Sequence, residues 1–365
     1  MGQPPHRTRI AVDANAVGFV VPELGRPSGG SHYNDSVLSS WPDDRPRVVA
    51  CPVRPGEPRT ASTLRSALRA HRVSIVDGLL GCEHPGELAG AEAEGHRLAL
   101  LVHMPRPEEP GLQPDDRSRL ATLESAAVHA ASAVIVPSRW AAHDLETRYG
   151  RTDLHVAVPG SERAPLAPAH SIPVMLQLGA IGPLKNQMLT ARAALAAPRS
   201  SFVVQFVGPV VDESYAAELA SLIRPLGRWA GVHPAVTGED RNRVLARADL
   251  MVSVSRHESY GLTVTEGLAR GIPALVGRGT GAQEALGAGG GLPGACVDTH
   301  DPAEMTAALT AFADDPGTRG RWRAAATVAR DRLPSWAPTA RRISEVCESL
   351  EHDFGARVRA EVEPP

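Results

Sequence analysis

The stretch LMVSVSRHESYGLTVTEGLARGIPALVG, residues 250–277, has the pattern of two strands joined by a turn and a helix. LMVSVS is an apolar run of strand length, and residues 259–261 form the turn that follows it. A helix is expected over residues 262–270, because Gly271 terminates it and Pro273 leads into the apolar run PALVG. A strand, a helix and a strand in this order form a βαβ unit, which predicts a parallel sheet.

The same alternation extends through the rest of the chain. In the first half, strands are expected at residues 9–14, 47–53, 73–78, 96–104, 133–138 and 154–160, with helical periodicity at 61–72, 115–132 and 138–150. Residues 159–173 carry four prolines and no apolar period, which predicts a linker. A second series follows, with strands expected at residues 174–180, 201–208, 232–238, 250–255, 273–277 and 294–298.

This organisation predicts an α/β protein with two Rossmann-like, doubly wound domains. The predicted domains are residues 1–164 and 165–335, followed by a helical tail, residues 336–365, that packs back on the first domain. Open α/β sheets bind ligands at the carboxyl ends of their strands, so the site is expected in a central cleft between the domains.

Length and composition exclude several classes of protein. The chain has 365 residues, enough for two domains that each bury a core. A net charge of -3 and an aromatic content of 4% give no general attraction to nucleic acid. No apolar run reaches the roughly 20 residues of a membrane span, and the first residues do not form a signal peptide, so a cytoplasmic protein is expected.

The cysteines do not suggest a metal site or a disulfide framework. They are scattered and lack CxxC spacing or paired histidines, so they are interpreted as free thiols: Cys51, Cys82, Cys296 and Cys347. A homodimer is left open as the state of assembly.

Glu258 and Glu266 lie on either side of the helix start within the opening stretch. The first backbone N–H groups of a helix have no partner within it and attract anions such as phosphate. A carboxylate beside such a place can accept hydrogen bonds from the vicinal hydroxyls of a sugar or a ribose. The alternative is structural: one acid offsets the helix dipole and the other faces solvent.

Three further features follow predicted strands. Gly179 lies in the turn after a strand, and Lys185 is expected in the first turn of the next helix, which begins near residues 185–186. A cation there opposes the helix dipole and is electrostatically favourable only if it shares an anion such as a diphosphate. Gly29 and Gly30 would allow a ligand to approach the backbone closely. His103 ends a buried strand and is expected to face the cleft. The alternatives are an exposed lysine, an ordinary turn and a histidine satisfied within the core.

Together these residues resemble the retaining nucleotide-sugar glycosyltransferases of the GT-B fold, in particular family four, the glycosyl transferases group 1. HESYGLTVTEGLARGIPALV is similar to the Glu-x7-Glu signature of that family. The resemblance continues in LQLGAIGPLKNQ, VTGEDRNRVLARADLMVSVS, TGAQEAL and PSWAPTARRISEV, and more loosely in SGGSHY, LVHMP and VIVPSRWAAHDL. It therefore covers nearly all of the second domain and the tail.

The resemblance implies a role for each matching residue. Glu258 would contact the hydroxyls of the transferred sugar, Glu266 would bind the ribose, and His103 would lie near the anomeric carbon or the sugar O6. Lys185 would neutralise the departing diphosphate and, with Glu258 and His103, form the catalytic set. The remaining donor-binding positions are expected to contribute mainly backbone or space: Gly29, Gly30, Gly179, Ser259, Tyr260, Gly261 and Leu262.

One position departs from the family. Many members have Gly-Arg where this chain has Gly179-Ala180, and that arginine is one of the two usual diphosphate cations. Arg139 and Arg256 are the candidates for an additional phosphate-binding cation.

The resemblance implies transfer of a hexose-type sugar from a GDP- or UDP-linked donor, with retention, no metal and no other cofactor. A small soluble acceptor is favoured, in specialised-metabolite biosynthesis, and the Ala-, Arg- and Pro-rich composition suggests an actinobacterial source. The alternatives are a lipid-linked or polysaccharide acceptor, a sugar-nucleotide 2-epimerase of the same fold, and an inactive sugar-nucleotide-binding homologue.

Overall fold

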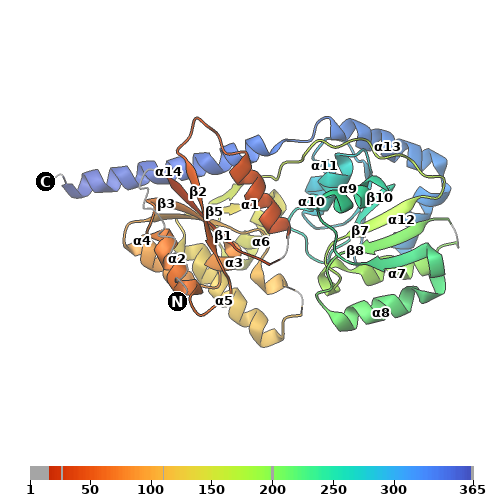
Figure 1. Ribbon diagram of the computed structural model, residues 1–365, viewed down its shortest axis with the longest axis horizontal. Helices are drawn as coiled ribbons and strands as arrows, with labels where there is room; N and C mark the ends of the chain where they lie inside the picture. The colour runs from red at the N-terminus through yellow and green to blue at the C-terminus, as the bar shows by residue number, and fades with distance from the viewer. Residues whose placement is uncertain (1–15, 26–27, 110, 199–200, 363–365) are drawn as a thin grey trace, which may run out of the picture.

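The computed structural model describes residues 16–25, 28–109, 111–198 and 201–362, with side chains described as far as His352. These residues form two lobes, each built on a six-stranded parallel sheet (Figure 1). The strand orders are β2-β1-β3-β4-β5-β6 and β12-β11-β10-β7-β8-β9. The chain passes from one sheet to the other between Val156 and Val174, an interval that contains the predicted domain boundary.

Strands and helices alternate in the first lobe, and its predicted strands from residue 47 onwards are all present. The elements of this lobe are β1 (Val17–Pro22), α1 (Gly29–Ser39), β2 (Val48–Val53), α2 (Thr60–Leu68), β3 (Val73–Asp77), α3 (Gly78–Gly81), α4 (Pro85–Ala93), β4 (Arg97–Leu101), η1 (Arg106–Glu108), α5 (Pro114–Ala130), β5 (Ala133–Val136), α6 (Arg139–Tyr149) and β6 (Leu154–Val156).

The second lobe repeats the arrangement and ends in the long tail helix. Its elements are β7 (Val174–Leu178), η2 (Pro183–Lys185), α7 (Gln187–Ala196), β8 (Val203–Val207), α8 (Glu213–Ile223), η3 (Arg224–Trp229), β9 (Ala230–His233), α9 (Gly238–Ala246), β10 (Leu250–Ser253), α10 (Leu262–Leu268), β11 (Ala274–Gly277), α11 (Ala282–Gly287), β12 (Gly294–Val297), α12 (Pro302–Asp314), α13 (Pro316–Arg330) and α14 (Trp336–Val362).

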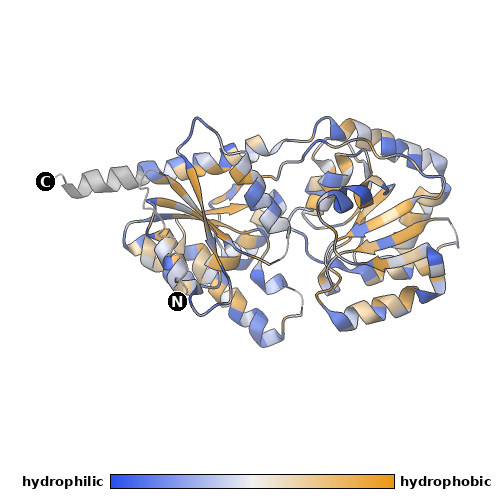
Figure 2. Cartoon of the chain, in the orientation of Figure 1, coloured by the Kyte–Doolittle hydropathy of each residue, from blue (hydrophilic) through white to orange (hydrophobic). Residues whose placement is uncertain are grey.

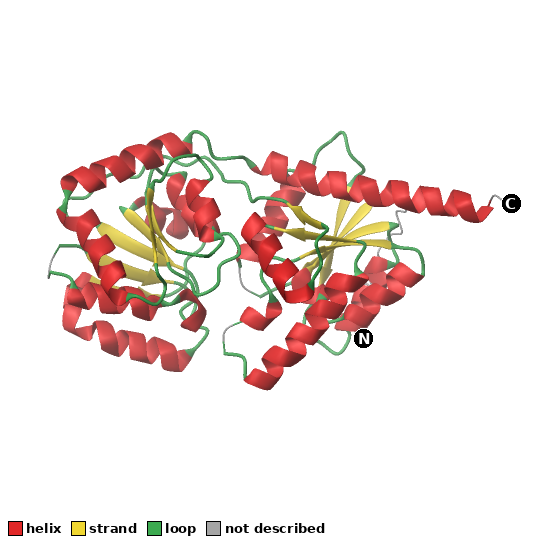
Figure 3. Cartoon of the chain, turned by 180° about the vertical axis from the view of Figure 1, so that it is seen from behind, coloured by secondary structure: helices red, strands yellow, loops and turns green. Residues whose placement is uncertain are grey.

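Helices cover both faces of each sheet, which is why the central strands are mainly apolar and buried along their whole length (Figure 3). Every residue of β3, β4, β5, β10 and β11 is buried. Coloured by hydropathy, the strands are mainly hydrophobic and the outer helices carry the polar residues (Figure 2). Apolar side chains that alternate along these strands thus form a core on each side of the sheet.

The strand before the glycine pair is β1, which the sequence pattern does not predict. The strand expected at residues 9–14 lies outside the described residues. Gly18 interrupts the apolar run of β1, and a Cβ atom there would lie 2.6 Å from Cδ2 of His71. β1 can approach His71 this closely only because Gly18 has no side chain. A glycine within a strand also weakens the apolar pattern by which the strand is predicted.

The glycine pair is also not a simple loop. Gly29 and Gly30 are the first two residues of α1, and Ser28 caps this helix by accepting a hydrogen bond from the backbone N–H of Ser31 at 3.1 Å. The glycines therefore present helix backbone to their surroundings.

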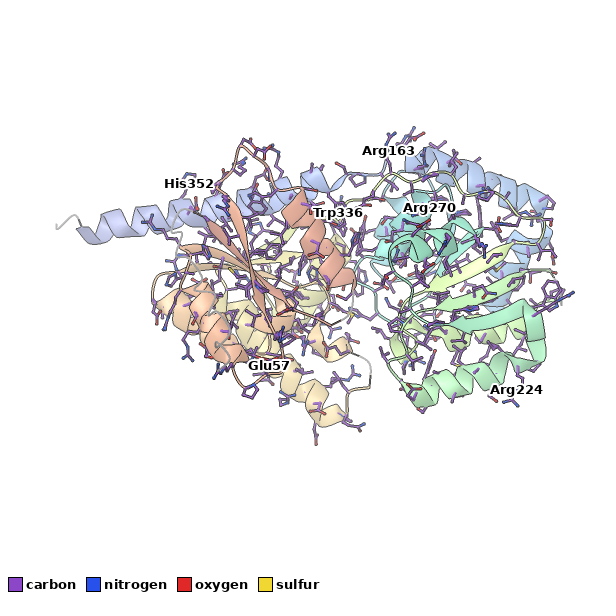
Figure 4. The ribbon with its side chains drawn as sticks, viewed as in Figure 1. Glu57, Arg163, Arg224, Arg270, Trp336 and His352 are labelled. Atoms are coloured by element: carbon purple, nitrogen blue, oxygen red, sulfur yellow. The ribbon has the colours of Figure 1, made fainter. Side chains whose placement is uncertain are left out.

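The tail packs on the first lobe as predicted, and α14 contacts α1, β3, β4 and β5. Trp336 marks the point where the chain re-enters that lobe (Figure 4). It joins the core that contains Tyr33. At this crossing a Cβ atom on Gly160 would lie 2.4 Å from the backbone nitrogen of Trp336, so the two connections between the lobes pass in contact.

Candidate functional site

The carboxyl ends of strands from both sheets meet between the lobes. A Cβ atom on Gly29 would lie 3.6 Å from Cδ1 of Leu262, the first residue of α10. Ser138, after β5, donates a hydrogen bond of 2.5 Å from its hydroxyl to the carbonyl of Ser259, after β10. Trp140 Nε1 donates to the carbonyl of Gly279 at 2.7 Å. Residues from both lobes thus surround the turn that opens α10.

Lys185 and Glu258, which lie far apart in sequence, form an ion pair. Lys185 Nζ lies 2.7 Å from Glu258 Oε2, and the hydroxyl of Ser255 donates to the same oxygen at 3.0 Å. The two side chains retain 29% and 17% of their accessible surface, respectively. A partly solvated pair of this kind adds little to stability. It instead places one cation and one carboxylate at adjoining strand ends.

The backbone around Lys185 is fixed from both sides. Gln177 Nε2 donates to the carbonyl of Lys185 at 2.5 Å, and Asn186 adopts left-handed φ/ψ values of 58° and 38°. Asn186 Nδ2 donates to the carbonyl oxygens of Thr299 at 2.8 Å and Val254 at 3.3 Å. Lys185 ends a 3-10 turn, and α7 begins only at Gln187. It therefore precedes the helix, whereas the sequence reading placed it within the first turn.

The side chain of Lys185 packs against Gly179. A Cβ atom there would lie 3.5 Å from Cε of Lys185 and 3.6 Å from Cδ and Cγ, so the aliphatic stem runs along this glycine. Ala180, the position that departs from the family pattern, follows directly.

The turn before α10 is compact and buried. Gly261 adopts φ 96°, which only glycine adopts without strain, and it is the N-cap of α10. A Cβ atom on Gly281 would lie 2.1 Å from the carbonyl oxygen of Ser259, so a second segment packs directly against the turn. Tyr260 is buried, and burial raises the pKa of its hydroxyl. The backbone at the helix start is thus held from several sides.

Glu266 lies on α10 and is bound by an arginine that sequence reasoning missed. Arg241, from α9, donates to its two carboxylate oxygens at 2.8 Å each. Arg270 links the same helices, because it donates to the carbonyl of Glu266 at 2.9 Å and to Oδ1 of Asn242 at 2.7 Å. The available signal was the segment VTGEDRNRV, but its spacing to Glu266 along the chain does not indicate a pair.

His103 follows β4 and is enclosed by the first lobe. Its Nε2 lies 2.9 Å from Asn34 Oδ1 and 3.3 Å from Asp77 Oδ2. Its ring packs edge to face on Tyr33 at 4.9 Å between centroids. A Cβ atom on Gly30 would lie 3.1 Å from its Cδ2. The sequence identified the histidine and the glycine but neither polar partner.

The two candidate cations remain exposed. Among the described residues, neither the Arg139 nor the Arg256 guanidinium has a hydrogen-bonding or charged partner at contact distance. The backbone N–H groups of Arg139 and Trp140 are bound by Glu284, which comes from the other lobe. Glu284 lies in TGAQEAL, a segment that the sequence reading connected to the family without assigning a residue.

Within the described part of the chain, no three His, Cys, Asp or Glu side chains are grouped so that they could hold a metal ion. The four cysteines are free thiols, as expected. None of the helices in the searched residues combines the length and apolarity needed to cross a bilayer.

The fold and the meeting of strand ends define a two-domain α/β protein of the GT-B type. Solved structures share this architecture over nearly the whole chain. HepE of Anabaena, in complex with UDP and glucose, matches with a TM-score of 0.72 and 16% identity, covering 92% of this chain and 99% of that one. Sucrose-phosphate synthase from Thermosynechococcus elongatus matches with a TM-score of 0.71 and 16% identity, covering 93% and 100%.

The sequence comparisons match the second domain most clearly. Residues 160–328, slightly less than half of the chain, match the model of the glycosyl transferases group 1. D-inositol 3-phosphate glycosyltransferase 1 of Catenulispora acidiphila is 30% identical over 63% of this chain and 60% of its own length. The corresponding protein of Streptomyces scabiei is 29% identical over 74% and 66%. The matched region thus spans about two thirds or less of these relatives.

Proposed function

We propose that this chain is a retaining glycosyltransferase that moves a hexose-type sugar from a nucleoside diphosphate sugar to a small soluble acceptor. The bond between the anomeric carbon and the diphosphate oxygen breaks, and its electron pair leaves with the diphosphate. The acceptor hydroxyl forms the new bond on the same face of the sugar, and its proton passes to the departing diphosphate.

The observation that carries this proposal is the ion pair of Lys185 with Glu258 at the start of α10. A cation there meets the charge that develops on the diphosphate, while the carboxylate accepts hydrogen bonds from sugar hydroxyls. Preorganised charge of this kind stabilises the leaving group without a strong base and without a metal. Glu266 is assigned to the ribose, with Arg241 holding both of its oxygens in place.

The backbone of residues 259–262 and the glycines at 29, 30 and 179 complete the donor side of the proposal. They let the diphosphate approach peptide N–H groups, which carry partial positive charge at a helix start. Exposed Arg139 and Arg256 are the candidates to replace the cation that Ala180 lacks.

Two observations support the donor and the acceptor classes. A protein of the same fold is described with UDP and glucose, and the sequence relatives are named for D-inositol 3-phosphate, a small polar acceptor. A small soluble acceptor is therefore favoured over a lipid-linked or polymeric one. We also propose a role in specialised metabolism in the cytoplasm, an actinobacterial source and assembly as a homodimer.

The decisive experiment is a binding screen of UDP-, GDP-, TDP- and ADP-sugars, followed by mass spectrometry with pools of small acceptors. Turnover of one nucleotide sugar only when an acceptor is present supports transfer. Conversion of the donor without any acceptor would indicate the epimerase, and tight binding with no conversion would indicate an inactive binder. If no nucleotide sugar binds, the proposal is wrong.

A further inference from the structure

Three polar side chains of the first lobe form a hydrogen-bonded relay that ends at His103. Asp77 closes β3, Asn34 lies in the middle of α1, and His103 follows β4. Asn34 Nδ2 donates to Asp77 Oδ2 at 2.6 Å, and Asn34 Oδ1 lies 2.9 Å from His103 Nε2. His103 Nε2 is also 3.3 Å from Asp77 Oδ2.

Asp77 is the fixed end of the relay. Its side chain is only 3% exposed, and Leu79 donates its backbone N–H to Oδ1 at 2.8 Å. Burial opposes ionisation, but the hydrogen bond and electrostatic attraction of His103, with hydrogen bonds from Asn34 and Leu79, outweigh it and hold the pKa of Asp77 below its usual value. The carboxylate is thus ionised at neutral pH and can only accept hydrogen bonds.

An acceptor at this end determines the orientation of the Asn34 amide. The amide must turn its NH₂ group towards Asp77, which leaves its oxygen for His103. Asn34 is 2% exposed, so water cannot freely replace either bond. His103 Nε2 then faces two acceptors, the amide oxygen and the carboxylate, and satisfies them only if it carries a proton.

The surroundings prevent the imidazole from turning over. Tyr33 packs against the ring, and the Cδ2 edge lies so close to Gly30 that a Cβ atom there would be 3.1 Å away. Turning the ring by half a revolution would replace Nε2 by a carbon and leave the amide oxygen and the carboxylate unpaired. Among the described residues, Nδ1 of His103 has no hydrogen-bond partner, and 19% of the side chain is exposed.

We propose that Asp77 and Asn34 are positioning residues that hold His103 with the proton on Nε2, so that neutral Nδ1 is presented as a hydrogen-bond acceptor to a hydroxyl of the bound sugar. The tautomer follows from the relay alone. The sugar contact rests on the proposed function.

The tautomer can be read from a long-range proton–nitrogen correlation spectrum of the full chain with isotope-labelled histidine, recorded at alkaline pH. His103→Gln identifies the signal. His96 is an internal reference of opposite type, because its Nδ1 lies 2.8 Å from the carbonyl oxygen of His71. We expect a protonated Nε2 for His103 and a protonated Nδ1 for His96. A protonated Nδ1 on His103 in the wild-type protein would overturn the proposal.

Variants test the sugar contact separately. Asp77→Asn removes the obligate acceptor, so both tautomers of His103 should be populated and kcat should fall about tenfold or more, with little change in donor KM. His103→Asn places an amide near Nδ1 and should retain more turnover than His103→Gln, whose amide lies near Nε2. Equal loss in these two variants would refute the sugar contact, while the wild-type spectrum would still decide the tautomer. If the wild-type protein turns over no nucleotide sugar, the proposed function fails and the tautomer result stands.

Discussion

Replacing Glu284 should loosen the contact between the two lobes, because this carboxylate caps a helix of the opposite lobe. Glu284 lies on α11, and its oxygens accept the backbone N–H groups of Trp140 at 2.6 Å and Arg139 at 3.1 Å. These are the first residues of α6, whose positive dipole end favours an anion. The N-cap of the same helix, Ser138, donates to the carbonyl of Ser259.

The size of the effect follows from these contacts. A hydrogen bond to a charged group contributes about 1.5–3 kcal/mol, and a charge at an exposed helix end adds about 0.3–1 kcal/mol. Because Arg139 is exposed, the lower ends of these ranges apply and the bonds are not fully additive. We therefore expect Glu284→Ala to remove about 2–3 kcal/mol of lobe contact, which shifts the ratio of closed to open molecules by roughly 30- to 150-fold. Glu284→Gln keeps one acceptor oxygen and should lose about half of this free energy.

Small-angle X-ray scattering measures the change directly, since separation of the lobes increases the radius of gyration. Glu218→Ala is the matched control, because Glu218 is an exposed glutamate of α8 in the same lobe. We expect the radius of gyration to be largest for Glu284→Ala, intermediate for Glu284→Gln and smallest for the wild type, with Glu218→Ala equal to the wild type. A Glu284→Ala profile that superimposes on the wild-type profile would refute the assigned role.

The other predictions concern the donor site and one buried acid. Lys185→Ala should reduce turnover by a factor of roughly a hundred or more, about 3 kcal/mol of barrier, with unchanged circular dichroism; wild-type turnover would eliminate its role. Glu258→Gln should impair sugar transfer more than nucleotide affinity, whereas Glu266→Gln or Arg241→Ala should mainly weaken nucleotide binding. If isothermal titration calorimetry shows that Glu258→Gln and Glu266→Gln lose nucleotide affinity equally, the two acids are misassigned. Burial raises the pKa of Glu124, although it accepts hydrogen bonds, so the folded state retains its proton more strongly. The free energy of unfolding of wild type relative to Glu124→Gln should therefore fall as the pH rises above about 4.3, the unfolded value; a difference independent of pH would contradict this.

Much of the fold could be predicted because its strands are buried on both faces. Runs such as Val73–Asp77 and Arg97–Leu101 are mainly apolar and buried throughout, and they stand out from the helical patterns around them. The strand Val17–Pro22 was missed because Gly18, which fits under His71, breaks the run. The only trace of this packing in the sequence is the glycine itself. A glycine can be present for many reasons, so it does not indicate which distant residue packs against it.

The features of the candidate site also fall into those that the sequence predicts and those that depend on the tertiary structure. The sequence by itself determined the two-domain plan, the turn before α10 and the residue types at the strand ends, because each depends on neighbours a few positions away. Only the tertiary structure decided that Lys185 pairs with Glu258, that Arg241 pairs with Glu266, and that Asp77 lies beside His103. These pairs join different strands and helices, and their geometry depends on how the elements cross, which no spacing along the chain specifies.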